Sequence, residues 1–158
     1  MIRRVALAAL LVISACSGSD PTTALPSFSL DRVDGTGALN LASVDGPALI
    51  NLWATWCAPC RRELPDIERI HRDVGNDVEV IGINVGDDPA QIRAYLDDLD
   101  APAITFTQLA DVANDVADYL AASTLPVTLV VVDGGIVERR DVPLSESELQ
   151  TLIAPYRD

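Results

Sequence analysis

The chain has 158 residues, which is long enough for one domain with an ordinary buried core. Its 24 acidic residues outnumber its 11 basic residues, and the formal net charge at pH 7 is -13. Because phosphate binding needs a clustered basic surface, this balance argues against nucleic acid as a partner.

The first predicted element is an export signal. Arg3 and Arg4 give a basic start, and residues 5–13 form an unbroken apolar run. That run is far shorter than the roughly 20 residues of a membrane-spanning helix, so it predicts the core of a signal peptide. It ends in the sequence ISAC, which resembles the lipobox of bacterial lipoproteins, where the cysteine is acylated and becomes the new N-terminus.

This resemblance implies a signal peptide over residues 1–15, a lipid-anchored tether over 16–26 and a folded domain over 27–158. An ordinary signal peptide with Cys16 near its cut is the alternative. Either route places the domain outside the cytoplasm, where disulfides form and persist. Lipid on Cys16 would leave two free thiols, so a zinc site built on four cysteines is excluded.

The predicted fold begins with a hairpin, because residues 28–30 and 38–41 flank a DGTG turn. Residues 48–53 and 78–85 are mostly apolar runs that suit buried strands. Between them, apolar residues at spacings of three and four predict a helix over residues 58–74.

The second half is predicted to hold three more helices and a second hairpin. One helix begins after an Asp88 cap, and another spans residues 111–121. A DGG turn joins residues 127–132 to residues 136–140 in the hairpin. The last helix opens at Ser145, which begins a capping-box pattern. This alternation predicts an α/β sandwich, with a central mixed sheet and helices on both faces.

The motif CAPC at residues 57–60 lies where a predicted strand gives way to a helix. Unsatisfied N–H groups and the helix dipole should lower the pKa of the Cys57 thiol, and the thiolate is the form that attacks disulfides. Cys60 can then resolve the mixed disulfide. Arg61 and Arg62 are expected on a solvated helix face, with a further lowering of the Cys57 pKa as the alternative.

Other chemistries for the cysteine pair are disfavoured. Zinc would need a second pair of ligands, and His71 is the only histidine. A purely structural disulfide gains little from closing a four-residue loop. Copper delivery calls for a methionine or histidine partner near the thiols, and export would remove the only methionine, Met1. A peroxiredoxin-type peroxidase would carry a threonine three residues before Cys57, where this chain has Ala54.

The stretch WATWCAPCRRELP, residues 53–65, resembles the TlpA/ResA-like branch of the thioredoxin superfamily. These are membrane-tethered extracytoplasmic thiol-disulfide oxidoreductases, many of which serve cytochrome c maturation. The resemblance covers residues 26–156. It implies a thioredoxin fold with an added N-terminal β-hairpin and a central insertion near residues 86–101.

Within this resemblance, Cys57 matches the attacking cysteine and Cys60 the resolving one. Leu125 and Pro126 match the loop facing them, where a cis-proline presents the backbone of Leu125 to a bound peptide. Trp56 is assigned to the same substrate groove. An ordinary trans turn proline is the alternative for Pro126.

Two further positions bear on proton transfer. Asn51 stands where cytoplasmic thioredoxins carry a buried aspartate, so that proton acceptor is missing. Residues 84–87 resemble the family segment that brings a glutamate towards the active site, which would make Asp87 the proton acceptor here. The alternative is that Asp87 or Asp88 only caps the following helix.

Together these features predict a thiol-disulfide oxidoreductase that uses the Cys57–Cys60 disulfide and needs no further cofactor or metal. Its predicted location is outside the cytoplasm, anchored to the bacterial membrane by lipid on Cys16. The predicted partners are extracytoplasmic protein thiols and disulfides, with apocytochrome c as a candidate, and a membrane electron donor of the thiol-reducing type. A disulfide-forming oxidant and a redox-linked peptide-binding module that does not turn over are the alternatives.

Overall fold

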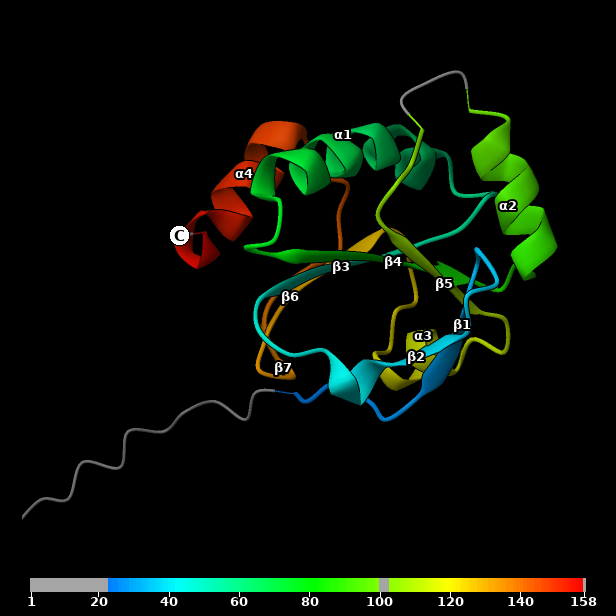
Figure 1. The fold of residues 1–158 in the computed structure, drawn as a ribbon, viewed down its shortest axis with the longest axis horizontal. Coiled ribbons are helices and arrows are strands. Elements are labelled where there is room, and N and C mark those ends of the chain that lie inside the picture. Colours follow the sequence, from blue (N-terminus) through cyan, green and yellow to red (C-terminus); the bar gives the residue numbers. More distant parts are fainter. Residues whose placement is uncertain (1–22, 100–102, 158) are drawn as a thin grey trace, which may run out of the picture.

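The computed structural model describes residues 23–99 and 103–157, so the predicted signal peptide and Cys16 lie outside the described residues. These residues form a seven-stranded sheet in the order β2-β1-β5-β4-β3-β6-β7 (Figure 1). The strands are β1 Ser29–Arg32, β2 Ala38–Asn40, β3 Ala48–Trp53, β4 Glu79–Val85, β5 Thr107–Asp111, β6 Val127–Val132 and β7 Gly135–Arg140. The helices are α1 Ala58–Val74, α2 Pro89–Asp97, α3 Asp115–Tyr119 and α4 Glu146–Ile153, with 3-10 turns at Leu41–Ser43 and Ala154–Tyr156.

The sheet is mixed, as the sequence predicts. Strands β3, β4 and β5 are parallel, whereas β6 is antiparallel to β3 and β7 is antiparallel to β6. The predicted β1–β2 hairpin forms and adds antiparallel to β5. None of the helices in the described residues is long and apolar enough to cross a membrane.

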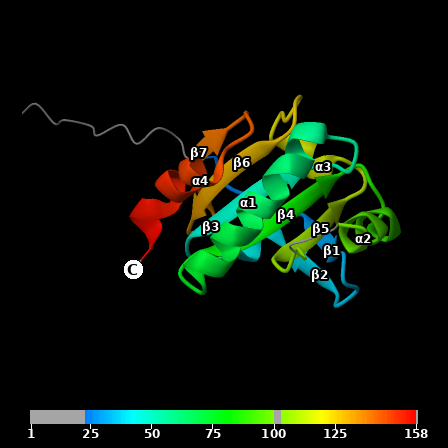
Figure 2. The same cartoon turned by 90° about the horizontal axis from the view of Figure 1, so that it is seen from above.

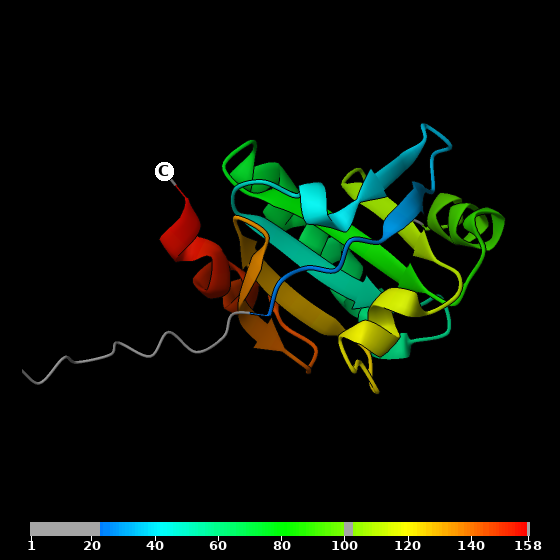
Figure 3. The same cartoon turned by 90° about the horizontal axis from the view of Figure 1, so that it is seen from below.

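Helices cover both faces of the sheet. Seen from above, α1 and α4 lie across one face (Figure 2), and seen from below, α3 lies on the other (Figure 3). Successive side chains of a strand point to opposite faces, so each central strand contributes to two cores. Leu49 and Trp53 of β3 belong to the core beneath α1, whereas Ile50 and Leu52 belong to the core beneath α3.

Most predicted elements are confirmed. Strand β3 and helix α1 have the predicted bounds, and α1 contains Pro65. Asp88 caps α2 in a capping box with Gln91, and Ser145 caps α4 in the predicted box with Glu148.

The predicted helix over residues 111–121 is wrong. Only Asp115–Tyr119 is helical, and Asp111 ends a strand that the sequence did not predict. The carboxylate of Asp111 accepts hydrogen bonds from the backbone N–H groups of Val116 and Ala117, at 3.1 Å each. Asp111 therefore acts as a side-chain cap for the short helix, because it accepts two N–H groups at the helix start that have no partner within the helix.

The start of the described chain is fixed to the edge of the sheet. Ala24 pairs with Gly135, at the beginning of β7, in an isolated antiparallel bridge. The N–H of Leu25 donates to the carbonyl of Gly134 at 2.9 Å, and that of Ile136 donates to the carbonyl of Thr23 at 3.0 Å. Thr23–Leu25 therefore covers the first residues of β7, which is otherwise an edge strand.

Candidate active site

The cysteine pair lies where β3 passes into α1. Cys57 is the N-cap residue of α1, and its Sγ accepts a hydrogen bond from the backbone N–H of Cys60 at 3.3 Å. The predicted placement at a helix start is therefore confirmed. In the reduced protein, a thiolate at this position would face the unpaired N–H groups and the positive end of the helix dipole.

A disulfide joins Cys57 and Cys60, whose Cα atoms are 5.3 Å apart. The exposed fraction is 4% for Cys57 and zero for Cys60. Of the two sulfurs, a partner can therefore approach that of Cys57. Trp56, the residue before it, is 68% exposed and is the most exposed large apolar side chain in the described chain.

The predicted facing loop lies at the same edge of the sheet. The Leu125–Pro126 peptide bond is cis, as the family resemblance implies. Pro126 immediately precedes β6, whose first residue, Val127, pairs with Leu52 near the end of β3. Leu125 is half-buried and Pro126 is buried. Their role in binding a substrate, like that of Trp56, stays a prediction.

Asp87 is brought against the turn that carries Cys57. Its Oδ2 accepts a hydrogen bond from the backbone N–H of Thr55 at 2.9 Å, and its own N–H donates to Asn84 Oδ1 at 3.3 Å. Asp88, and not Asp87, caps the following helix. Asp87 therefore holds the active-site turn, and its role as a proton acceptor stays a prediction.

Asn51 lies beneath α1 and is almost fully buried. Its Nδ2 donates to Thr128 Oγ1 at 3.0 Å and to Glu63 Oε2 at 3.4 Å. Where cytoplasmic thioredoxins carry a buried aspartate, this chain thus has the amide of Asn51. That amide contacts another buried acid, Glu63.

Glu63 is the functional candidate that the sequence analysis missed. It is 2% exposed, and the backbone N–H of Leu144 donates to its Oε1 at 2.9 Å. Burial raises the pKa of Glu63 to about 7, although the bonds from Leu144 and Asn51 oppose the shift. Glu63 is three residues after Cys60, so the two lie on the same face of α1. A carboxyl that titrates near neutrality and lies one helical turn from a thiol is suited to exchange protons with it.

The signal for Glu63 is its position on the buried stripe of α1. Cys60, Leu64, Ile67 and Ile70 define that stripe at spacings of three and four, and Glu63 falls within it. An acid on a buried stripe marks either a paired charge or a perturbed pKa.

A second group of contacts supports the turn from the side of α2. Trp53 is fully buried, and its Nε1 donates to Gln108 Oε1 at 3.0 Å. Gln108 fits there because its strand neighbour is Gly82, where a Cβ would lie 2.4 Å from Gln108 Oε1. The ring of Trp53 also packs on Tyr95, with 5.8 Å between ring centroids. Trp53 is therefore a core residue beneath α1.

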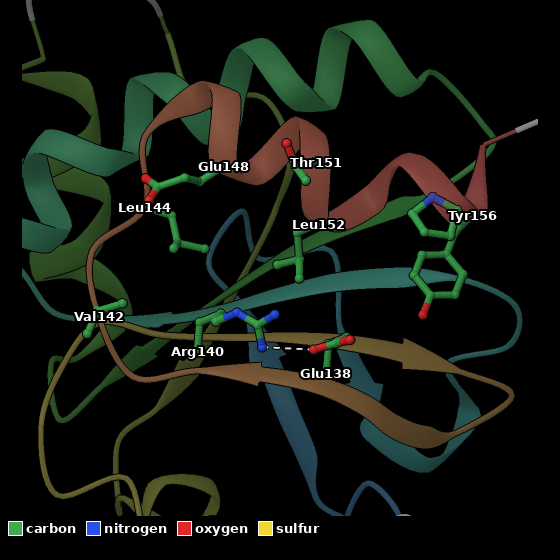
Figure 4. Close-up of a pocket in the computed structure, with 9 residues that line it drawn as sticks. Glu138, Arg140, Val142, Leu144, Glu148, Thr151, Leu152 and Tyr156 are labelled. Atoms are coloured by element: carbon green, nitrogen blue, oxygen red, sulfur yellow. Dashed lines mark hydrogen bonds and ion pairs between the residues drawn. The ribbon is translucent and has the colours of Figure 1, made fainter.

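A cavity of about 420 Å³ lies elsewhere, between β7 and α4 (Figure 4). Val142, Leu144, Leu152 and Tyr156 form its apolar wall, and a Glu138–Arg140 ion pair of 2.8 Å lies along β7. None of the predicted site residues lines this cavity. Within the described ranges, no group of three or more His, Cys, Asp or Glu residues could hold a metal ion.

Comparison with known proteins gives matches over most of the chain. The profile of the AhpC/TSA family matches residues 21–140. The thioredoxin-like protein YneN of Bacillus subtilis is 31% identical over 116 residues, which cover 72% of this chain and 66% of YneN. This chain thus spans slightly less than two thirds of that relative. The thiol-disulfide oxidoreductase ResA of Bacillus subtilis is 26% identical over 148 residues, covering 90% of this chain and 78% of ResA.

Solved structures show the same fold. A DsbF homologue from Corynebacterium diphtheriae superposes with a TM-score of 0.72 and 24% sequence identity, covering 84% of this chain and 85% of that one. The predicted thioredoxin-like arrangement of a mixed sheet between helices is therefore confirmed.

Proposed function

The chain belongs to the AhpC/TSA family of thioredoxin-like proteins, and on that premise we propose that it is an extracytoplasmic, membrane-tethered thiol-disulfide oxidoreductase that reduces disulfides of partner proteins. The observation that carries the proposal is the disulfide of Cys57 with Cys60 at the N-cap of α1. The printed names of the relatives, which include a thiol-disulfide oxidoreductase, support the same chemistry.

The reaction is two successive exchanges. In the first, the Cys57 thiolate attacks one sulfur of the client disulfide, so that a mixed disulfide forms and one client thiolate leaves. In the second, Cys60 loses its proton and attacks the Cys57 sulfur, which restores the Cys57–Cys60 disulfide and releases the second client thiolate. The client gains two electrons and two protons, and the cysteine pair loses them. A thiol-reducing electron donor must then return the pair to its reduced state.

Three buried or ordered groups support these steps. The N–H of Cys60, which donates to the Cys57 sulfur in the disulfide form, would stabilise the negative charge of the Cys57 thiolate in the reduced protein. Asp87 fixes the turn through the N–H of Thr55. Glu63, with its pKa near 7, is suited to accept the proton of Cys60 and to return it in the next cycle.

The direction of the reaction and the client class rest on the resemblance to the TlpA/ResA-like branch. That resemblance favours reduction, with apocytochrome c as a candidate client and a membrane thiol reductant as donor. The reduction potential of the Cys57–Cys60 pair, measured against glutathione, tests the direction. A value near or below about -270 mV would support a reductant, whereas a value near about -120 mV would identify an oxidant.

The exchange step itself is tested with Cys60→Ser. Without the resolving thiol, Cys57 should remain bound to its client as a mixed disulfide, detectable by mass under non-reducing conditions. The matched control is the double variant Cys57→Ser and Cys60→Ser, which should trap nothing. A protein that binds clients equally well with and without Cys57 would be a binding module and not an oxidoreductase.

Membrane tethering rests on the apolar run followed by ISAC at residues 13–16. If Cys16 is acylated, labelled fatty acid should be incorporated into the wild-type protein and not into Cys16→Ser. Labelling that persists in the variant would refute lipid attachment at Cys16.

A further inference from the structure

The arginines of this protein divide into two groups. All 11 basic residues are arginines, and nine of them lie in the described part of the chain. Seven of these nine donate hydrogen bonds or form ion pairs: Arg32, Arg69, Arg72, Arg93, Arg139, Arg140 and Arg157. Within residues 23–99 and 103–157, only Arg61 and Arg62 have no such partner, and both follow the cysteine pair directly.

The placement of Arg61 and Arg62 opposes local helix electrostatics. They are the fourth and fifth residues of α1, at the end of its first turn, and the first turn contains no acidic residue. A helix N-terminus favours negative charge, so two exposed cations there are unfavourable for the helix itself. In a chain with net charge -13, carboxylates are abundant, yet none in the described part of the chain is paired with these two guanidinium groups. Local rules are most often broken at functional sites.

One of the two arginines, Arg61, contacts an aromatic side chain near the cysteine pair. The guanidinium carbon of Arg61 lies 5.7 Å from the centroid of the Tyr95 ring, and Tyr95 in turn packs on Trp53. Arg61 is four residues after Cys57 on the same helix, so their Cβ atoms lie about 6 Å apart. Stacking on Tyr95 leaves the N–H edge of the guanidinium available, and that edge matches the two oxygens of a carboxylate.

We propose that Arg61 and Arg62 form an anion-recognition surface that selects clients with carboxylate side chains next to the disulfide to be exchanged. The partner is therefore an acidic protein segment, which would contact the arginines while its disulfide meets Cys57 and its apolar residues meet Trp56. This inference rests on the proposed function and adds the chemistry of the client to it. Binding of an acidic client would explain why these two arginines have no hydrogen-bond or ion-pair partner among the described residues.

The test uses three peptides that share one disulfide and differ only in flanking residues: two Asp, two Gln or two Arg. The second-order rate constant for reduction is measured with reduced wild-type protein and with Arg61→Gln/Arg62→Gln. The wild type should reduce the acidic peptide about tenfold faster than the Gln peptide, which corresponds to about 1.4 kcal/mol. In the double variant this ratio should fall to about one.

The competing role for the two arginines is to lower the pKa of Cys57. If that were their role, the double variant would reduce all three peptides more slowly by the same factor. The ratios between the rate constants of the peptides would then equal those of the wild type, and this result would overturn the proposal. A wild type without preference for the acidic peptide would overturn it as well. Arg69→Gln is the matched control, because Arg69 lies on the same helix but is paired with Asp66 and Glu146. It should keep the wild-type ratios.

The two proposals fail in different ways. If no peptide is reduced, the proposed function fails. Binding can then still be measured with peptides whose own two cysteines are replaced by serine. Their dissociation constants show whether the oxidised protein prefers the acidic sequence. If all peptides are reduced at equal rates, the oxidoreductase function stands and only the acidic client is refuted.

Discussion

The two faces of the sheet are built from the same strands but differ in chemistry. Beneath α3, the inward residues of the central strands are apolar: Ile50, Leu52, Ile81, Ile83, Leu109 and Leu129. Beneath α1, the alternate positions carry buried polar side chains: Asn51, Asn84, Gln108 and Thr128. Helix α1 adds buried Glu63 and Glu68 on this side. Both faces have an apolar core, but the α1 face buries several polar side chains within it, whereas Asp111, at the end of β5, is the buried acid that contacts α3.

The polar face is costly to maintain. Among the described residues, Asn51 Oδ1, Asn84 Nδ2 and Gln108 Nε2 are buried without a hydrogen-bond partner. Each unsatisfied polar atom costs about 1–3 kcal/mol of stability. The α1 face therefore contributes less to stability than its buried apolar side chains alone would give. Substitutions on the two faces should consequently separate stability from thiol chemistry.

The largest expected effect is on the apolar face. Leu52→Ala should lower the free energy of unfolding by about 2–5 kcal/mol, because Leu52 is fully buried and its loss leaves a cavity. Urea denaturation of the oxidised protein measures this loss. The rate of disulfide exchange should be unchanged while the variant is folded. A folded Leu52→Ala protein with slowed exchange would show that the faces are not independent.

On the polar face, Glu63→Gln should remove a pH dependence of stability. Below pH 4.5 Glu63 is protonated in the folded and unfolded chains alike. From there to about pH 7 the unfolded chain releases the proton and the folded chain keeps it. The free energy of unfolding should therefore fall by about 3 kcal/mol as pH rises through this window. Denaturation at a series of pH values should show this fall in the wild type and not in the variant.

Glu68 is the matched comparison for Glu63, since both acids are buried on α1. Burial opposes ionisation of Glu68, but hydrogen bonds from Thr105 and Arg72 outweigh it and hold the pKa of Glu68 below its usual range. Its contribution to stability is present above the unfolded pKa and is lost as the pH falls. Glu68→Gln should therefore leave the fall between pH 4.5 and 7 in place. If both variants abolished that fall, it could not be assigned to Glu63.

The smallest expected effect compares two buried aspartates at the ends of neighbouring strands. Asp111→Ala should cost about 1–2 kcal/mol, because α3 loses its side-chain cap, and should leave thiol exchange unchanged. Asp87→Ala should cost a similar amount but also slow exchange, because the N–H of Thr55 loses its acceptor. Stopped-flow kinetics with a disulfide peptide compares the two. If the two variants exchanged disulfides at the same rate, Asp87 would have no specific role in the active site.

Local patterns in the sequence predicted the elements that are determined locally. Helix α1 has a periodic apolar stripe, and Asp88 and Ser145 begin capping boxes, so their positions followed from neighbouring residues. Strand β5 was missed because its identity depends on pairing with β4 and β1, and because Gln108 and Asp111 conceal its apolar pattern.

The cysteine pair could be predicted because its spacing and its position before a helix are visible in the sequence. Glu63 could not be assigned with the same ease. Its pKa is raised by burial in the folded protein and is opposed by hydrogen bonds from Leu144 and Asn51, which are 81 and 12 residues away along the chain. The burial that creates this acid is a property of the tertiary structure, and only its place on the buried stripe hinted at it.

The attachment of Thr23–Leu25 to the start of β7 determines how the domain would respond to force. A pull on the N-terminal side of Thr23 reaches the bond between Thr23 and Ile136 before the bond between Leu25 and Gly134. The contacts would therefore break one after another, until Phe28, whose carbonyl accepts the N–H of Leu41, bears the load. Releasing residues 23–27 would free about 17 Å of extended chain at the cost of exposing Leu25 and Pro26, which are buried. Residues 23–27 could therefore be pulled away from the edge of the sheet while β3, which leads to the cysteines, keeps its pairing with β4 and β6.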